Sequence, residues 1–475
     1  MAGPQTVIAD ARRHRARYLE ELKEFVRFPS ISAEPARAPD LERCAGWLVR
    51  HLRSMGLTSA RVIPTAGHPL VLATTRKVPG RRTLLVYGHY DVQPTDPLSE
   101  WWTPPFCPTV RAGALYGRGA SDDKGQLFAH LKALESYLRA AGEMPVNLIC
   151  LIEGEEEVGS PGLTRFLRAQ GRRLGADAVV VSDMPMAGPG RPAITYAMRG
   201  ALSLQLDVRG PARDLHSGLY GGAVHNPAQA LAEIITGLHR PDGRVAVPGF
   251  YRDVRRWSAR ERAYMRRVGP NDGRLAANGK IRTAWGEPGF TLYERTTIRP
   301  ALTVNGMAGG YQGPGAKAVI PARATAKLGL RLVPDQDPAG IERLIGRRIA
   351  ALTPETVTAS LRTEFAAEPV LVDRGAPAVR AAYAALERGF GTAPVFVRLG
   401  GTIPPVSTMQ RELDAPIVLM GFALPDDGMH APNERFHLDN FFRGIETVVW
   451  FLDALGSPAF SSRGPGPAAR PGEPP

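Results

Sequence analysis

Residues 83–91 read TLLVYGHYD, an apolar run that ends in a histidine and an aspartate. Two similar apolar runs follow at residues 146–152 and 177–181, and each leads into acidic side chains. Short runs of this kind, bounded by turn residues, are typical of strands that are buried on both faces. A helical pattern at residues 125–141 separates the first two runs. The sequence therefore predicts an α/β layer with a mostly buried sheet and crossover helices.

The pattern changes near residue 198, where apolar and polar residues begin to alternate as they do in a half-exposed strand. From there the order strand, helix, strand, strand, helix, strand is the ferredoxin-like order of a two-layer sandwich. These elements are expected as a strand at 201–208, a helix at 227–238, two strands within 318–333, a helix at 338–352 and a strand at 357–372.

The predicted fold class is α/β: a mixed sheet with helices on both faces, interrupted by an inserted ferredoxin-like α+β domain. Helices are expected at 7–28, 40–55, 378–390 and 440–455, with an apolar run at 417–420. The predicted domains are residues 1–197 and 372–456 as two parts of the first domain, 198–371 as the inserted domain, and 457–475 as a disordered tail rich in proline and glycine.

Composition excludes several classes of protein. The chain has 59 Lys and Arg against 46 Asp and Glu, a net charge of +13. However, no basic run is interleaved with aromatic residues, so we expect no nucleic-acid partner. No stretch reaches the roughly 18 to 20 apolar residues of a membrane helix, so we expect no membrane partner. Charged residues follow Arg12 and Arg13 where an export signal needs an apolar segment, which predicts a cytoplasmic location.

The cysteines are Cys44, Cys107 and Cys150. They are odd in number and have no CxxC spacing, which argues against a disulfide framework and against a thiolate zinc site. We expect them to be reduced and structural.

Acids and histidines gather in five segments at or near the ends of apolar runs, where an α/β sheet presents functional residues. Each segment alone has a simpler interpretation. Asp122 and Asp123 could cap the helix that follows them, and the glutamates at 155–157 could be a solvated charge run. Carboxylates crowded beside buried strands repel one another, however, so a cation should lie among them. The five segments are GHYD at 88–91, SDDKG at 121–125, EGEEE at 153–157, VSD at 181–183 and DDGMH at 426–430.

A pair of divalent ions would supply that cation. Asp122, Glu157 and Asp183 as ligands, with Glu156 beside them, carry four negative charges against four positive ones, and His89 and His430 add neutral donors. Asp91 lies two residues after His89, where it can accept the hydrogen of the other ring nitrogen. A mixture of histidine and carboxylate favours Zn, Mn or Co.

Six motifs together resemble the di-metal exopeptidase family that includes cytosolic nonspecific dipeptidase, carnosinase, carboxypeptidase G, aminoacylase and succinyl-diaminopimelate desuccinylase. The resemblance extends from about residue 18 to residue 456. The segment DLHSGLYGG, with ITYAMRG before it, is most similar to the dipeptidase branch. The motifs are GHYDVQP, YGRGASDDKG, EGEEEVGS, VVVSD, DLHSGLYGG and DDGMHAPNE.

The resemblance implies a role for each residue of the metal centre. Asp122 bridges two ions, His89 and Asp183 complete one site, and Glu157 and His430 complete the other. Asp91 orients His89. Glu156 is the general base because the family's base immediately precedes its ligand glutamate; spacing alone does not distinguish Glu155, Glu156 and Glu157. The family also holds the bond between residues 122 and 123 in the cis form.

On the substrate side, the resemblance implies that His216 reaches the active site of a partner in a homodimer and stabilises the oxyanion. The sequence alone favours a loop histidine in a glycine-rich turn for His216 and a surface-strand arginine for Arg331. The resemblance makes Arg331 the clamp on the substrate's terminal carboxylate. Gly400, Gly401 and Thr402 meet the same end of the substrate, with Arg398 assisting.

Two departures from the dipeptidase branch lie on the substrate side. Ala318 stands where that branch has a substrate-contacting threonine, and the stretch around Asp373 lacks a histidine that the branch carries. The expected function is hydrolysis of dipeptides or short peptides next to a free C-terminal carboxylate. An N-acyl amino acid amidohydrolase and a glutamate-type carboxypeptidase are alternatives with the same chemistry. A non-catalytic scaffold is the alternative from another class, and Glu156 speaks against it.

Overall fold

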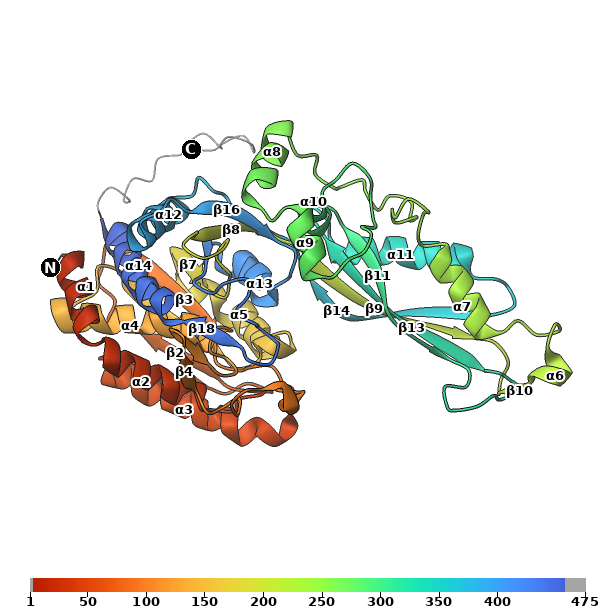
Figure 1. Cartoon of the computed structure of the whole chain (residues 1–475), viewed down its shortest axis with the longest axis horizontal. Helices are drawn as coiled ribbons and strands as arrows, with labels where there is room; N and C mark the ends of the chain where they lie inside the picture. The colour runs from red at the N-terminus through yellow and green to blue at the C-terminus, as the bar shows by residue number, and fades with distance from the viewer. Residues whose placement is uncertain (1–2, 458–475) are drawn as a thin grey trace. The chain divides into compact units, whose positions relative to one another are not determined.

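The computed structural model describes residues 3–457, and the chain folds into two compact units (Figure 1). Among the described residues, unit 1 holds 3–196, Val372–Val397 and 403–457. Unit 2 holds Ala197–Leu371 together with the short stretch Arg398–Thr402. The predicted tail lies outside the described residues, except for Ser457. The inserted domain is also expected to serve as the dimerisation and lid domain, and this role stays a prediction.

A nine-stranded mixed sheet forms the centre of unit 1. Its four middle strands, β6, β3, β7 and β17, are parallel to one another, and the outer pairs are antiparallel. β3 (Thr83–His89) and β6 (Asn147–Glu153) are buried along their whole length, as their apolar sequences predict. The order is β1 (Arg61–Ile63), β2 (Leu70–Thr74), β6, β3, β7 (Ala178–Val181), β17 (Ile417–Met420), β8 (Ala193–Met198) and β15 (Val370–Leu371), with β16 (Val395–Leu399) also paired to β8.

Crossover handedness places helices on both faces of this sheet. β3 leads through α4 (Lys124–Ala141) to β6 on one side, whereas β6 leads through α5 (Pro161–Leu174) to β7 on the other side of β3. Because connections between parallel strands are right-handed in nearly all proteins, the two opposite directions of crossing place these helices on opposite faces. α14 (Leu438–Gly456) packs on α4, on α1 (Pro4–Arg13) and on α12 (Pro377–Phe390), and α13 (Pro404–Leu413) packs on α5.

A small three-stranded sheet joins distant parts of the chain in unit 1. β18 (Arg435–His437) pairs with β5 (Ala114–Tyr116), which pairs with β4 (Thr109–Arg111). Arg435 lies opposite Tyr116, so the DDGMHAPNE segment ends beside the start of YGRGASDDKG. Two motifs separated by about 300 residues in the chain therefore come together.

Unit 2 is built on a four-stranded antiparallel sheet in the order β11, β13, β9, β14. Alternate residues of β9 and β13 enter one core, where α7 and α11 cover the sheet. α7 carries Ala230, Leu231 and Ile234 into this core, and α11 carries Ile341, Ile345 and Ile349. The bounds are β9 (Gly200–Arg209), α7 (Pro227–Thr236), β11 (Ala301–Gly309), β13 (Arg323–Leu332), α11 (Pro338–Leu352) and β14 (Thr358–Ala367).

The remaining elements of unit 2 are short. β10 (Leu215–His216) pairs with β12 (Val319–Ile320), and α6 (Ser217–Tyr220) follows β10 directly. Between α7 and β11 lie α8 (Ala259–Val268), α9 (Asp272–Asn278) and α10 (Leu292–Thr297). The last of these begins with a capping box between Thr291 and Glu294.

Three expectations from the sequence are wrong in detail. The helix expected at 7–28 is two helices, α1 and α2 (Arg15–Val26), which meet at His14. The strand expected at 357–372 is divided into β14 and β15, which belong to different sheets. The stretch 318–333 supplies only one strand of the four-stranded sheet, because its partner is β11. β11 was missed because most of its residues are exposed and a bulge at Asn305 interrupts its pattern.

The helix expected at 40–55 is α3 (Ala38–Ser54). Elements that the sequence patterns did not reveal include α5, α13, β8 and β16. Within residues 3–457, no helix combines the length and the apolar character needed to cross a bilayer.

Candidate metal centre

The candidate ligands lie at one edge of the unit 1 sheet because parallel strands end there together. His89 is the last residue of β3, and Asp183 follows β7 by two residues. Glu156 and Glu157 begin a single 3₁₀ turn, Glu156–Val158, shortly after β6. Asp122 precedes α4, and His430 lies in the loop between β17 and β18.

These side chains form two groups that share Asp122. One group is His89, Asp122 and Asp183, and the other is Asp122, Glu157 and His430; within each group the ligand atoms lie within 4.8 Å of one another. The Nε2 atom of His89 is 3.2 Å from Oδ1 of Asp122, and the Nε2 atom of His430 is 2.9 Å from Oδ2. Asp122 therefore presents one carboxylate oxygen to each histidine.

Asp91 contacts both a histidine and the glutamate turn. Its Oδ1 lies 3.4 Å from Nδ1 of His89, and its main-chain oxygen lies 3.1 Å from the same nitrogen. The two carboxylate oxygens accept the backbone N–H groups of Glu156 and Glu157 at 3.2 and 3.1 Å. One fully buried carboxylate thus fixes the His89 ring and the turn that carries both glutamates.

The two simpler interpretations of the acidic segments do not hold. Asp123 occupies the position before α4 but makes no side-chain capping hydrogen bond, and its Oδ2 accepts the backbone N–H of His89 at 3.3 Å. Glu155 is buried, and Glu156 and Glu157 are half-buried, so this run is not solvated. The peptide bond between Asp122 and Asp123 is cis, as the resemblance implied.

Burial and mutual repulsion shift the pKa values of the carboxyl groups upward. Burial raises the pKa of Glu157 to about 7, and the Asp122 carboxylate adds to the rise. Burial likewise raises the pKa of Glu156 and of Asp183 well above their ordinary values. Burial would also raise the pKa of Asp122, but the hydrogen bond from His430 and the nearby His89 ring outweigh burial and lower that pKa.

The residues present fit a pair of divalent cations. Nε2 of His89 is fully buried and has no hydrogen-bond partner, an arrangement that costs free energy unless a further group binds this nitrogen. The carboxylates around it repel one another in a site largely shielded from water. Oxygen and imidazole donors suit Zn, Mn and Co, and none of the donors is a thiolate.

Glu434 is a supporting residue that we did not single out from the sequence. Its buried carboxylate accepts the backbone N–H groups of Gly119, Ser121 and Asp122, at 2.9 to 3.0 Å. It also accepts a hydrogen bond at 2.9 Å from the buried guanidinium of Arg118. These bonds hold the loop that presents Asp122. Glu434 is the last residue of DDGMHAPNE, so its place in that motif was the available signal.

Two more contacts support the candidate ligands. The side-chain amide of Gln93 donates to Oε2 of Glu157 at 2.6 Å. The buried ring of His130 lies 2.6 Å from the hydroxyl of Ser182, the residue before Asp183. His130 thus supports the residue before a candidate ligand.

In unit 2, Arg331 lies beside two of the residues expected at the substrate's carboxyl end. Its Nη1 donates to the Thr402 hydroxyl at 2.8 Å, and that hydroxyl donates to the main-chain oxygen of Arg199 at 2.6 Å. Arg199 in turn donates to the main-chain oxygen of Gly400 at 3.0 Å. Arg331 is exposed, and no carboxylate among the described residues pairs with it.

Gly400 leaves no room for a side chain, because a Cβ there would lie 2.5 Å from the main-chain oxygen of Thr296. Arg398 is engaged elsewhere in unit 2: its guanidinium lies 3.2 Å from Glu261 and 3.7 Å above the ring of Trp257. This geometry favours a structural role for Arg398 over contact with substrate.

His216 lies elsewhere in unit 2, at the start of α6, and is exposed. Its Nδ1 accepts the backbone N–H of Gly218 at 3.0 Å. A neutral ring whose Nδ1 accepts must carry its hydrogen on Nε2, so Nε2 is a donor.

Known proteins share both the sequence and the fold. Residues 85–454 match the peptidase family M20/M25/M40. The Cys-Gly metallodipeptidase dug1 of Schizosaccharomyces pombe is 31% identical over 467 residues, 93% of this chain and 96% of the relative. The Beta-Ala-His dipeptidase of Homo sapiens is 28% identical over 456 residues, 92% of this chain and 90% of the relative.

Among solved structures, an M20 family metallo-carboxypeptidase of Sulfolobus solfataricus has a TM-score of 0.83 and 32% identity, covering 92% of this chain and 99% of that one. The family and the α/β fold class expected from the sequence are therefore confirmed. The chain belongs to peptidase family M20/M25/M40, a family of metal-binding hydrolases.

Proposed function

We propose that this protein is a dipeptidase that hydrolyses the amide bond next to a free C-terminal carboxylate. The observation that carries the proposal is the arrangement of two ligand groups around the shared Asp122, with Glu156 beside them. The names of the two curated relatives, a Cys-Gly metallodipeptidase and a Beta-Ala-His dipeptidase, support dipeptides as substrates.

Two divalent ions are the proposed cofactors, with Zn preferred and Mn or Co as alternatives. His89, Asp122 and Asp183 would hold one ion, and Asp122, Glu157 and His430 the other. Such ions polarise the scissile carbonyl and lower the pKa of the attacking water. Asp91 would keep the Nδ1 hydrogen of His89 in place, which leaves Nε2 free as the ligand atom.

Glu156 is the proposed general base. Its backbone N–H donates to the Asp91 carboxylate, which fixes the backbone of Glu156 beside the ligands. It would take a proton from the attacking water and deliver it to the leaving nitrogen. Its neighbour Glu157 cannot share this work because it belongs to the ligand group and accepts a hydrogen bond from Gln93.

Arg331 is the proposed clamp on the substrate carboxylate, with Gly400, Gly401 and Thr402 beside it. The guanidinium uses one nitrogen on Thr402, which orients the group and leaves donors for a charge-assisted bond to a carboxylate. Thr402 is itself fixed by the main-chain oxygen of Arg199. The absence of a carboxylate partner within the described part of unit 2 leaves this cation available for substrate.

His216 is proposed to act in the active site of a partner, which makes the protein a homodimer. Within unit 2, His216 pairs with Val319 of β12, just before the first residue of β13 in the chain. Arg331, in contrast, lies next to the last residue of β13. A strand of ten residues spans roughly 30 Å, far more than a dipeptide. His216 and Arg331 of one chain are therefore too far apart to contact one dipeptide, which supports a site shared between two chains.

A carboxypeptidase is the second candidate, favoured by the name of the Sulfolobus solfataricus structure. An N-acyl amino acid amidohydrolase would use the same residues. We also propose a cytoplasmic location, which the three free thiols support, since one of them, Cys107, is exposed.

Removing the metal tests the proposed function. A chelator should abolish hydrolysis of dipeptides with a free carboxylate and lower the thermal midpoint, because the ions offset repulsion among carboxylates. Rates should be compared for dipeptides, longer peptides and N-acyl amino acids after Zn, Mn or Co is restored to stripped protein. Full activity in metal-free protein would refute the proposal, and a preference for N-acyl amino acids would replace it with the deacylase.

The variants Glu156→Gln and Glu157→Gln should lose different properties, catalysis in the first and metal binding in the second. The first variant should keep about two ions per chain and lose roughly 100-fold or more in kcat, the scale of general acid–base catalysis. The second should lose one ion, because it removes a ligand oxygen. Metal analysis and kcat measured on the same preparations check this, and exchanged phenotypes would show that the two roles are assigned the wrong way round.

Arg331→Met should lower kcat/KM for a free-acid dipeptide far more than kcat/KM for the matching C-terminal amide. The expected difference in transition-state stabilisation is about 3 kcal/mol, because only the acid offers a charge-assisted bond. The measurement is kcat/KM for both substrates. Arg323→Met is the matched control, likewise exposed at the other end of β13, and should affect neither. Equal losses of kcat/KM for the acid and the amide would show that Arg331 supports the fold and does not bind the substrate carboxylate.

Two inactive variants should rescue each other if His216 acts on the partner's substrate. In a mixed dimer of His216→Ala and Glu156→Ala chains, one site has Glu156 from the first chain and His216 from the second. An oxyanion donor contributes roughly 10²- to 10³-fold in rate. Co-expressed and verified heterodimers should therefore exceed both parents in activity. Heterodimers no better than their parents would exclude a shared site.

A further inference from the structure

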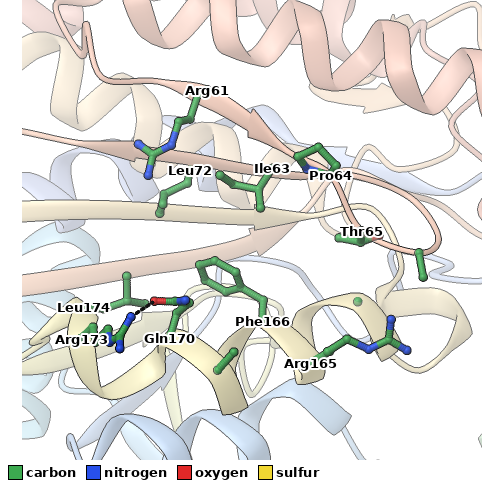
Figure 2. A pocket seen from close by; sticks show the side chains of 13 residues that line it. Arg61, Ile63, Pro64, Thr65, Leu72, Arg165, Phe166, Gln170, Arg173 and Leu174 are labelled. Atoms are coloured by element: carbon green, nitrogen blue, oxygen red, sulfur yellow. Dashed lines mark hydrogen bonds between the residues drawn. The ribbon is translucent and has the colours of Figure 1, made fainter.

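A hollow of about 580 Å³ lies in unit 1 between the edge strand β1 with its neighbour β2 and the helix α5 (Figure 2). None of its 13 lining residues belongs to the candidate metal centre. Its size falls within the range of small-molecule sites, roughly 300 to 1,000 Å³.

The inside of the hollow is apolar. Ile63 and Leu72 come from the strands, and Phe166 and Leu174 come from α5. Figure 2 shows Leu72 and Phe166 projecting toward each other from opposite walls. On α5 the lining residues recur at helical spacing, so one face of this helix forms a whole wall. An apolar body would therefore be covered on two sides.

The margin of the hollow is cationic. Arg61, Arg165 and Arg173 are exposed lining residues, and no acidic residue is among the 13. Arg173 donates a long hydrogen bond of 3.4 Å to Gln170, and within residues 3–457 none of the three arginines has an ion-pair partner. In Figure 2, Arg61 and Arg173 lie toward one end of the hollow and Arg165 toward the other.

The walls are fixed before any ligand arrives. The buried carboxylate of Glu155 accepts the backbone N–H of Gly162 at 2.9 Å, in the first turn of α5. Its other oxygen accepts the backbone N–H of His68 at 3.1 Å, in the loop that continues from β1. One side chain thus ties the helix wall to the strand wall, and a preformed hollow binds a ligand without a large ordering cost.

We propose that this hollow binds a small anion with an apolar body, its charged head between Arg61 and Arg173 and its body against Phe166 and Ile63. Unpaired guanidinium groups prefer carboxylate and phosphate, and the apolar walls exclude fully hydrated ions. The site is independent of the proposed peptidase activity, because its residues take no part in the candidate metal centre.

Calorimetric titration of the metal-loaded protein tests this site. The probes are 4-phenylbutyrate and phenyl phosphate, which separate a carboxylate head from a phosphate head, with 4-phenylbutanol as the uncharged analogue. At least one anionic probe should bind with saturation, and the alcohol should bind about tenfold more weakly or not at all. Absence of saturable binding of both anions would overturn the proposal.

Charge reversal locates the binding. The double variant Arg61→Glu and Arg173→Glu should lose about tenfold or more in probe affinity, because two attractions become repulsions. Arg168→Glu with Arg172→Glu is the matched control, since both are exposed on α5, make the same charge change and do not line the hollow.

The control variant should bind within about twofold of the original protein, a difference of less than one hydrogen bond. If both double variants lost probe affinity equally, the loss would come from net charge and not from the hollow, which would overturn the proposal. Binding that a saturating dipeptide displaces would belong to the substrate site and would also overturn it. Thermal midpoints close to that of the original protein confirm that both variants are folded.

Discussion

Crowding of carboxylates around Asp122 is the constraint on which the rest of the structure depends. Asp122 lies between His89 and His430, with Asp183 on one side and Glu157 on the other, in a site largely shielded from water. Such a cluster is unfavourable by itself and becomes favourable with cations among its members. The surrounding chain supplies the rigidity that this requires. Glu434 holds the backbone before Asp122, and Asp91 holds both the His89 ring and the glutamate turn.

Much of the fold and of the site could be predicted because buried strands and motifs are local signals. The runs before His89, Glu153 and Asp183 are apolar on both faces, and parallel strands must end at one edge. That rule brings the segments after β3, β6 and β7 together, whereas Asp122 lies before α4. The family resemblance added what spacing could not, namely which of three consecutive glutamates is the base and which ligand is shared.

The parts that could not be predicted depend on partners far along the chain. β11 is exposed and bulged, so its sequence carries little alternation, and only pairing with β13 makes it a strand. The membership of Arg398–Thr402 in unit 2 has no local signal, because its neighbours on both sides belong to unit 1. Glu434 acts through backbone N–H groups that begin at Gly119; its motif marks the residue, but nothing local to position 434 predicts which backbone it binds.

The two departures from the dipeptidase branch, at Ala318 and around Asp373, leave the local turns hydrogen-bonded. Ala318 contributes its main-chain oxygen, which accepts the backbone N–H of Ser217 at 3.1 Å and so holds the turn beside His216. That bond needs no side chain, so loss of a threonine hydroxyl leaves the His216 turn in place. Asp373 caps its own turn by accepting the N–H of Gly375 at 2.8 Å, where a histidine is absent. Neither turn therefore depends on a side chain that the branch carries and this chain lacks.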